Sequence, residues 1–171
     1  MKIIKEYKVA YVRRAKLEDQ VGIHDSHMRS IREICVHDHG EEEIKGWGYR
    51  DVRSKEQWLQ TLDNQNRFVW VVEHEEEIEG HCFISLVLEE AKADIHSLYL
   101  TPVVYKKGFG AILMEHMLEV AKANNIEEIF LQSTITAYSF YKRYGFEDAG
   151  PMEKVEIGGY PVRAFPMKLT L

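Results

Sequence analysis

The sequence predicts an α/β fold built on one mixed sheet, with strands and helices in the order β-α-α-β-β-β-α-β-α-β-β. Three observations lead to this prediction. Apolar residues alternate in some segments, as in strands, and recur at helical spacing in others. No internal repeat, low-complexity linker or change of composition divides the chain. A length of 171 residues is ordinary for one domain, so we expect residues 1–171 to form a single domain.

The N-terminal part is expected to contain a strand and a long helix. Residues Tyr7–Arg14 alternate and are rich in β-forming residues, which predicts a strand. Leu17–Asp19 then open a helix, and apolar residues recur at helical spacing from Val21 to Val36. The sequence His37-Asp38-His39-Gly40 interrupts this pattern, so we expect the helix to break there.

A second helix and a hairpin follow. Ser54 begins the helix over Lys55–Asn64, because Gln57 completes a capping box with it. Residues Arg67–His74 and His81–Leu88 are two apolar runs joined by a glutamate-rich turn. Such a pair is typical of an antiparallel hairpin.

The C-terminal half is expected to alternate between strands and helices. Asp94–Thr101 predicts a strand, and Gly108–Asn124 predicts a strong helix with one apolar face. Glu128–Ser133 predicts the next strand and Thr136–Tyr144 a short helix. Two last strands are expected from Phe146 onward.

Charge and composition disfavour several classes of protein. The net charge of −6 disfavours a nucleic-acid binder, which needs a basic face, and makes cationic or neutral small substrates easier to accommodate. The acidic runs Glu41–Glu43 and Glu75–Glu77 are expected to be solvated faces or turns. Cys35 and Cys82 are far apart without metal spacing, so neither a disulfide framework nor a zinc site is expected.

The expected location is the cytoplasm. Two cysteines fit a reducing compartment, and the first residues lack the apolar core of a signal peptide. No stretch approaches the roughly 18 apolar residues of a membrane span. We therefore expect a soluble protein without a membrane partner.

The turn before the predicted helix at Gly108 is a candidate anion site. The first N–H groups of a helix lack partners and carry the positive end of the helix dipole. Gly108 and Gly110 permit close approach of a phosphate, and Lys106 and Lys107 add positive charge. Neither a Walker loop nor a dinucleotide fingerprint is present, and a tight turn without a ligand explains the glycines equally well.

A second motif lies about 30 residues later. Tyr138 and Tyr141 are three positions apart, which places them on one helix face. One of these phenols can point into a cleft beside the preceding helix. Taken alone, the aromatic residues Phe140, Tyr141 and Tyr144 are better explained as residues of an ordinary core.

Together the two motifs resemble those of the GNAT (Gcn5-related) N-acetyltransferase superfamily. Its pattern is Gln/Arg-x-x-Gly-x-Gly/Ala followed by Asn-x-x-Ala-x-x-Phe/Leu-Tyr-x-x-x-Gly-Phe, and the element order is also similar to the family fold. The matching residues are Gly108, Gly110, Ala137, Phe140, Tyr141, Gly145 and Phe146. Tyr105 stands where the family prefers Gln or Arg, and Thr134 where it often has Asn.

The resemblance implies an acyltransferase that uses acetyl-CoA and acetylates a primary amine of a small molecule or peptide. It implies that the strand near Leu98 separates from its neighbour and offers backbone groups to the pantetheine arm. Tyr141 takes the place of the general acid. The implied coenzyme-binding residues are Leu98, Tyr99, Leu100, Tyr105, Lys106, Lys107, Gly108, Phe109, Gly110, Ala111, Thr134, Ala137 and Tyr141.

Asp94 and His96 are the candidate bases. They are two residues apart on a predicted strand, so both side chains face the same side. By resemblance, position 94 matches the glutamate base of histone acetyltransferases, and positions 94 and 96 match a histidine pair in serotonin N-acetyltransferase. The base can be His96, Asp94 or an ordered water. A structural explanation is also open, in which Asp94 is a surface charge at the strand end and His96 is a satisfied polar residue of a half-buried strand.

The acceptor is expected between the first helices and the last hairpin, with His27, Trp47 and Tyr160 as candidate contacts. No metal is expected, because His37-Asp38-His39 lacks an evident third ligand. Alternatives are a longer acyl-CoA, a hydroxyl acceptor, or a non-catalytic acyl-CoA sensor on the same fold. A homodimer through the last strands is a further expectation of the resemblance.

Overall fold

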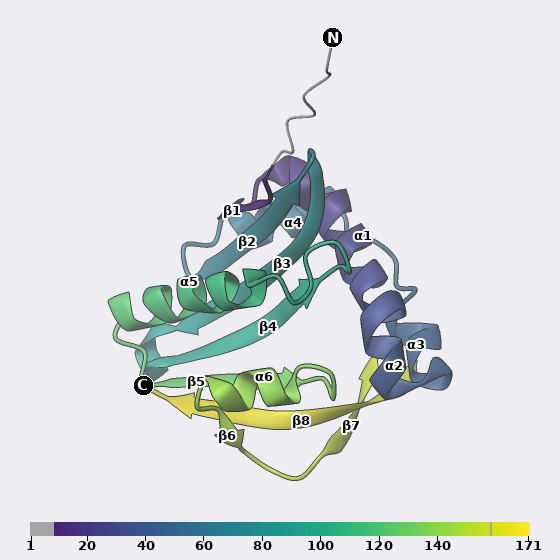
Figure 1. Cartoon of the computed structure of the whole chain (residues 1–171). Helices are drawn as coiled ribbons and strands as arrows, with labels where there is room; N and C mark the ends of the chain where they lie inside the picture. Colours follow the sequence, from purple (N-terminus) through teal and green to yellow (C-terminus); the bar gives the residue numbers. More distant parts are fainter. Residues whose placement is uncertain (1–8, 158) are drawn as a thin grey trace.

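Eight strands form one sheet in the computed structural model, which describes residues 9–157 and 159–171 (Figure 1). The strand order is β1-β2-β3-β4-β5-β8-β6, and β7 pairs with β8. All neighbours are antiparallel except β4 and β5, which are parallel. The strands are β1 Tyr11–Arg14, β2 Arg67–His74, β3 Glu77–Val87, β4 Lys92–Leu100, β5 Glu128–Ser133, β6 Glu147–Asp148, β7 Glu153–Ile157 and β8 Tyr160–Thr170. The predicted mixed α/β class is confirmed.

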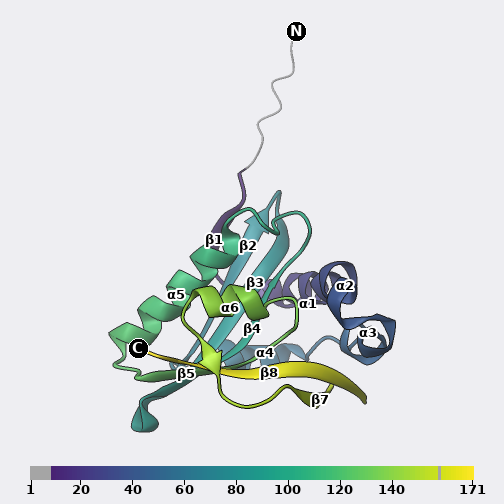
Figure 2. The same ribbon diagram turned by 60° about the horizontal axis from the view of Figure 1, so that its bottom comes forward.

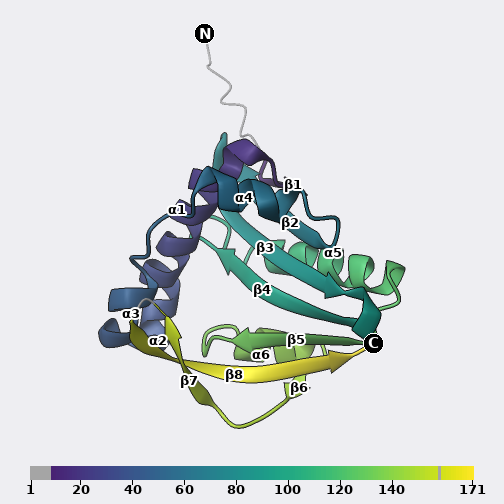
Figure 3. The same ribbon diagram turned by 180° about the vertical axis from the view of Figure 1, so that it is seen from behind.

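Helices cover both faces of the sheet. Figures 1 and 3 show α5 and α6 on one face and α1 and α4 on the other. The α-helices are α1 Gln20–Ser30, α2 Val36–His39, α3 Glu41–Trp47, α4 Lys55–Leu62, α5 Phe109–Ala123 and α6 Tyr138–Arg143. Short 3-10 helices, η1 Leu17–Asp19 and η3 Leu88–Glu90, complete the helical elements together with one π-helical turn, η2 Ile31–Cys35.

The long N-terminal helix is confirmed in position and differs in its end. α1 continues through the π-helical turn η2 into α2, so the segment is helical from residue 20 to residue 39. The break therefore falls at Gly40, whose φ of 79° is accessible to glycine, and not at His37. Residues 7 and 8 of the predicted first strand lie outside the described residues.

Helix α3 was not predicted. The run Glu41–Glu43 forms its first turn, where the helix dipole favours negative charge. Glu43 is not a solvated turn residue: it accepts hydrogen bonds from the Arg163 backbone N–H at 2.7 Å and from the Arg163 guanidinium. These bonds outweigh burial and lower the pKa of Glu43. The pair fixes α3 beside the start of β8, which Figure 2 shows.

The capping box at α4 is confirmed. The Ser54 hydroxyl accepts from the Gln57 N–H at 3.2 Å, and the Gln57 side-chain oxygen accepts from the Ser54 N–H at 3.1 Å. A capped first turn places Trp58 against the sheet, where it packs with Ile23, Val69 and Val71. The local sequence signal therefore also positions a core residue.

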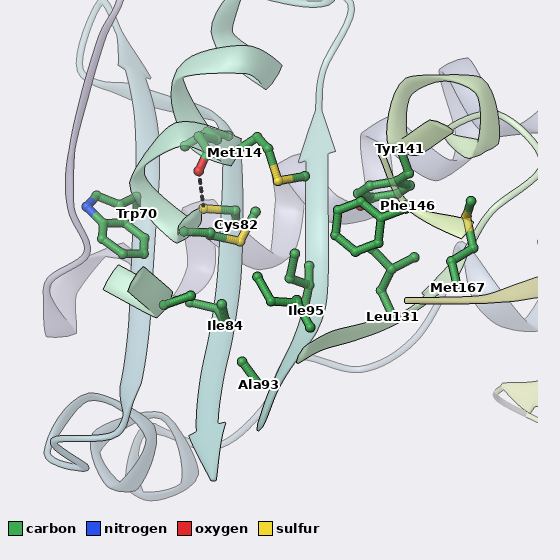
Figure 4. Close-up of a cluster of buried hydrophobic side chains, with 14 of the residues drawn as sticks. Trp70, Cys82, Ile84, Ala93, Ile95, Met114, Leu131, Tyr141, Phe146 and Met167 are labelled. Atoms are coloured by element: carbon green, nitrogen blue, oxygen red, sulfur yellow. Dashed lines mark hydrogen bonds between the residues drawn. The ribbon is translucent and has the colours of Figure 1, made fainter. Parts of the chain in front are cut away.

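The main core lies between the sheet and the α5 and α6 face (Figure 4). Leu113, Met114 and Met117 of α5 are fully buried against β2, β3 and β4. Cys82 lies within this core, and its thiol donates to the Leu113 carbonyl at 3.8 Å. Both Cys35 and Cys82 are free and buried.

The parallel strands β4 and β5 pair over only part of their length. Their register runs from Lys92 opposite Glu128 to Ile95 opposite Leu131 and ends there. At the same place the register of β4 against β3 shifts, because His96 is an extra residue between the pairs made by Ile95 and Ser97. The rest of β4 leaves β5, as predicted, and opens a gap in the sheet.

Candidate functional site

A cavity of about 590 Å³ occupies the gap between β4 and β5, and we call it the strand-gap cavity. Its walls come from the end of β4, the turn before α5, the start of α6 and the π-helical turn. Ten predicted coenzyme residues line it: Leu98, Tyr99, Leu100, Tyr105, Lys106, Gly108, Gly110, Ala111, Thr134 and Ala137. The turn sequence and the α6 motif therefore meet at one cavity.

The N-terminus of α5 faces this cavity as an anion site. Gly108 is the N-cap with φ of 91°, no side chain caps the helix, and no acidic residue lies in its first turn. Unpartnered N–H groups and the helix dipole there favour an anion. Lys106 contributes its charge from a residue with φ of 58°, a strained conformation for lysine.

Helices α5 and α6 come close together at Gly110. A Cβ at this position would lie 3.4 Å from the Phe140 ring of α6, an ordinary contact distance. Arg143 of α6 lines the same cavity as Lys106. Arg143 was not predicted, because its motif position carries no fixed residue type.

Three predicted coenzyme residues do not line the strand-gap cavity. Lys107 donates to the Val103 carbonyl, and Phe109 packs against the main core. Tyr141 lies behind the wall, 5% exposed, edge-on to Phe140 at 5.4 Å and to Phe146 at 5.5 Å between ring centroids. Figure 4 shows its ring beside Phe146.

The Tyr141 phenol is held in its protonated form. Burial, with a smaller contribution from Cys82, raises the pKa of Tyr141 well above 10. Phe140 lines the strand-gap cavity and packs edge-on against Tyr141, so the Tyr141 ring lies behind that wall residue.

Thr134 has a local structural contact. Its hydroxyl accepts from the Ala137 N–H at 3.0 Å at the start of α6. Nearby, the Ile135 N–H donates to His39 Nε2 at 3.0 Å, which links α2 to this loop.

Some residues in the wall of the strand-gap cavity were not predicted. Most come from the loop at Thr134, from α6 and from the first helix: Ser30, Ile34, Cys35, Thr136, Ser139 and Phe140. The apolar helix pattern indicated only a core role for Ile34 and Cys35.

Asp94 and His96 face the same side of the sheet, as predicted. Both are exposed on the α1 and α4 face, while Ala93 and Ile95 point into the main core. The His96 ring stacks on Phe83 at 4.4 Å, and its Nε2 lies 2.7 Å from the Ser85 hydroxyl. Desolvation lowers the pKa of His96 below 6.5 and Asp94 opposes this shift; the exposure of the residue leaves solvent to screen both effects.

A second cavity of about 230 Å³ lies on the α1 side of β3 and β4, and we call it the histidine cavity. Its walls include His24, His27, His81 and His96, together with Arg50 and Arg53. His27 and His96 are thus brought together. His81 and the two arginines were missed, because only the three-dimensional pairing of β3, β4 and the loop after α3 assembles them.

The other two candidate acceptor contacts lie elsewhere. Trp47 is 2% exposed and packs edge-on to His39 at 4.9 Å between ring centroids. Tyr160 lines a separate groove of about 380 Å³ with Glu42 and Arg163. Neither lines the histidine cavity.

Two further searches covered the described part of the chain. No group of three or more His, Cys, Asp or Glu residues within it is arranged to hold a metal ion. No helix there is long and apolar enough to cross a membrane.

Comparisons with known proteins agree with the motifs. The family model of the acetyltransferase (GNAT) domain matches residues 35–171. A comparison with curated proteins gave no significant match.

Solved structures share the fold at low sequence identity. A GCN5-related N-acetyltransferase from Rhodopseudomonas palustris superimposes with a TM-score of 0.78 at 16% identity, covering 96% of this chain and 98% of that one. The PaiA N-acetyltransferase from Thermoplasma acidophilum, in complex with coenzyme A, gives 0.73 at 20% identity, covering 95% and 99%. The ribosomal-protein-S18-alanine N-acetyltransferase from Escherichia coli gives 0.67 at 12% identity, covering 95% and 94%.

These likenesses show the fold, and the family model spans most of the sequence. Its match includes the turn at Gly108, the strand-gap cavity's β4 wall and the α6 motif. Acetyl-CoA is the acyl donor that proteins of this family use. The chain therefore belongs to the GNAT acetyltransferase family.

Proposed function

We propose that the protein transfers the acetyl group of acetyl-CoA to a primary amine of a small molecule or peptide, by direct attack in a ternary complex. One observation carries the proposal: two cavities flank the same short segment of β4. Leu98, Tyr99 and Leu100 line the strand-gap cavity, while His96 and Ser97 line the histidine cavity. A donor and an acceptor bound in these cavities meet at β4.

The strand-gap cavity fits a coenzyme with a pyrophosphate. The uncapped start of α5, Lys106 and Arg143 supply positive charge and N–H donors at one end. The unpaired stretch of β4 supplies backbone groups of the kind that bind an extended chain by strand addition. When bound there, acetyl-CoA supplies an activated acyl thioester.

Direct attack is favoured over transfer through the protein. Cys35 is the cysteine in the cavity wall, and burial raises the pKa of its thiol to about 12. The thiolate is the nucleophilic form, so this cysteine is a poor acyl carrier at neutral pH. The amine itself is then the attacking group.

Tyr141 is proposed as the general acid. Its raised pKa keeps the phenol protonated, so it can donate a proton to the departing thiolate. Tyr99 lines the cavity wall, and its hydroxyl is proposed as a relay for the proton. With this relay, Tyr141 can supply the proton although it is buried behind the cavity wall.

His96 is proposed as the general base, with Asp94 and an ordered water as the alternatives. The lowered pKa keeps the imidazole neutral at pH 7, which leaves it able to accept a proton from the acceptor ammonium. Asp94 stabilises the imidazolium that forms, because the two groups share one side of β4. The attacking amine is then deprotonated next to the gap.

Thiol release from acetyl-CoA with a panel of primary amines tests the proposal. We expect release that depends on the amine, and an acetyl amide identified by mass spectrometry. Alcohols and longer acyl-CoA esters serve as comparators for the alternative acceptor and donor. Coenzyme binding without turnover of any amine or alcohol would instead indicate an acyl-CoA sensor.

A further inference from the structure

The histidine cavity contains a guanidinium without an anionic partner. Arg50 is half-buried; its Nε donates to the Trp47 carbonyl at 3.1 Å, and one Nη lies 3.4 Å from His27 Nε2. Among the described residues, no carboxylate forms an ion pair with Arg50. A partly buried charge without a counter-ion is unfavourable, so this position favours the binding of an anion.

His81 provides an independent sign of a ligand. It is 3% exposed, lines the same cavity, and its Nδ1 has no hydrogen-bond partner in the described part of the chain. Buried polar atoms without partners are rare in proteins, and a ligand is one way to satisfy them. The ring lies 5.1 Å from His27, whose ring lies 4.0 Å from Tyr99 of the strand-gap cavity.

The cavity is positive although the whole chain carries a net charge of −6. Burial lowers the pKa of His81 to about 3 and the pKa of His27 well below 6.5, so both rings are neutral at pH 7. Arg50 and Arg53 therefore face a single carboxylate, that of Asp51, in the cavity wall. The net charge favoured a cationic or neutral acceptor, whereas the local charge of this cavity favours an anionic group on the acceptor.

Resting on the proposed function, we propose that the acceptor is a small primary amine that also carries an anionic group, a carboxylate or a phosphate. Arg50 and Arg53 bind the anionic group, and the His81 ring hydrogen-bonds the ligand. The amine then lies toward His96 at the β4 end of the cavity. A volume of about 230 Å³ is below the roughly 300–1,000 Å³ of pockets for drug-sized ligands, so the acceptor is small.

The transfer leaves the anionic group unchanged. A bond forms between the amine nitrogen and the acyl carbon, and the carbon–sulfur bond breaks. The ammonium proton goes to His96, which later releases it to solvent. The departing thiolate receives a proton from Tyr141, and the second proton that the nitrogen loses as the amide forms restores the Tyr141 phenol. No co-reactant beyond acetyl-CoA and the amine is required.

Matched pairs of amines test the charge requirement on the unmodified protein. Glycine and β-alanine are each compared with the corresponding amide, glutamate is compared with its diamide, and O-phosphoethanolamine is compared with ethanolamine. We expect kcat/KM for at least one anionic amine to exceed that of its uncharged partner by about tenfold or more. The carboxylate and phosphate arms identify which anion is used. Putrescine and spermidine, which are cationic and carry no anionic group, are expected to have a still lower kcat/KM than the uncharged partners.

Three variants assign the effect to the cavity. Arg50→Gln is expected to lower kcat/KM for the anionic amine about tenfold more than kcat/KM for its uncharged partner. Arg50→Lys, which keeps the charge, is expected to recover part of the loss. Lys122→Gln removes one positive charge from the exposed end of α5, and the preference should persist in this control.

Calorimetric titration of the same amines separates this proposal from the proposed function. One outcome is that anionic amines bind, that Arg50→Gln weakens this binding, and that no amine is turned over. This result supports the anion site and contradicts acetyl transfer. The anion site is overturned, and acetyl transfer is kept, if uncharged amines are turned over as fast as their anionic partners. The same holds if Arg50→Gln affects both members of a pair equally. If no amine is bound and none is turned over, both the anion site and the proposed acetyl transfer are contradicted.

Discussion

Tyr141 and His96 approach the gap between β4 and β5 from opposite faces of the sheet. Tyr141 belongs to the core under α6, whereas His96 lies on the face that carries α1 and α4. Each is held by contacts that do not involve a ligand: Tyr141 by Phe140 and Phe146, and His96 by Phe83 and Ser85. The proposed acid and the proposed base thus lie on opposite faces, which suits a reaction that takes place in the gap.

Tyr141→Phe is expected to lower kcat by about tenfold to a thousandfold, because it removes the proton donor while keeping the packing of the ring. Coenzyme affinity, measured by calorimetry, should remain close to that of the unmodified protein. Tyr138→Phe is the matched control, since this phenol on the same helix donates to Asp148 at 2.8 Å on the surface. Equal activity of the two variants would remove Tyr141 from the mechanism.

His96→Gln is expected to lower kcat/KM and to remove the acidic limb of its pH profile. The base acts in its neutral form, so activity should fall as the pH drops through the pKa of His96, which lies below 6.5. Ser85→Ala, which removes a hydrogen-bond partner but no titrating group, should keep the limb. A limb that survives in His96→Gln and disappears in Asp94→Asn would assign the base to Asp94.

At the scale of elements, the start of α5 depends on a glycine at one position. Gly108→Ala is expected to cost about 1–2 kcal/mol of unfolding free energy, because its φ of 91° is unfavourable for alanine. It should also weaken coenzyme binding, since the new methyl group enters the open space in front of the first N–H groups. Denaturant unfolding and calorimetry measure the two effects.

Gly145→Ala is the control for this prediction. Gly145 has φ of 88°, and a Cβ there would lie at an ordinary 3.5 Å from Leu169. Its backbone cost is therefore similar, but it does not line the strand-gap cavity. Coenzyme binding that weakens equally in both variants would attribute the effect to lost stability.

Local signals in the sequence predicted several helices and strands, including elements that build the strand-gap cavity. Glycines, a capping box and apolar periodicity act within a few residues, so α4, α5 and β5 lie where their patterns indicate. Helix α3 was missed because Glu41–Glu43 and nearby glycines are equally typical of a turn, and its contact with Arg163 is 120 residues away. His81 and Arg50 were missed for the same reason: no local pattern shows that they share a cavity.

At the scale of the whole molecule, buried neutral histidines couple the fold to pH. The unfolded chain binds a proton at His81 near pH 6.5, whereas the folded protein binds it only near pH 3. Between these values the unfolded state holds more protons, so stability is fully present above pH 6.5 and falls as the pH drops toward 3. His27, buried beside it, adds to this loss.

His81→Asn is expected to reduce the slope of unfolding free energy against pH by about 1 kcal/mol per pH unit between pH 6.5 and 3. Denaturant unfolding at several pH values measures the slope. His37→Asn, which replaces an exposed histidine on α2, is the matched control for the substitution itself. An unchanged slope in His81→Asn would show that His81 is not buried in its neutral form.

The position of β8 in the sheet has a consequence for biosynthesis. Strands β1 to β4 each pair with the next strand along the chain, so this half can assemble as it leaves the ribosome. Strand β5 also pairs antiparallel with β8, which follows much later in the chain, and β6 pairs with β8 as well. The sheet beyond β5 is thus completed only after residues 160–170 have been made, and a nascent chain that stalls before them leaves the outer edge of β5 without its antiparallel partner.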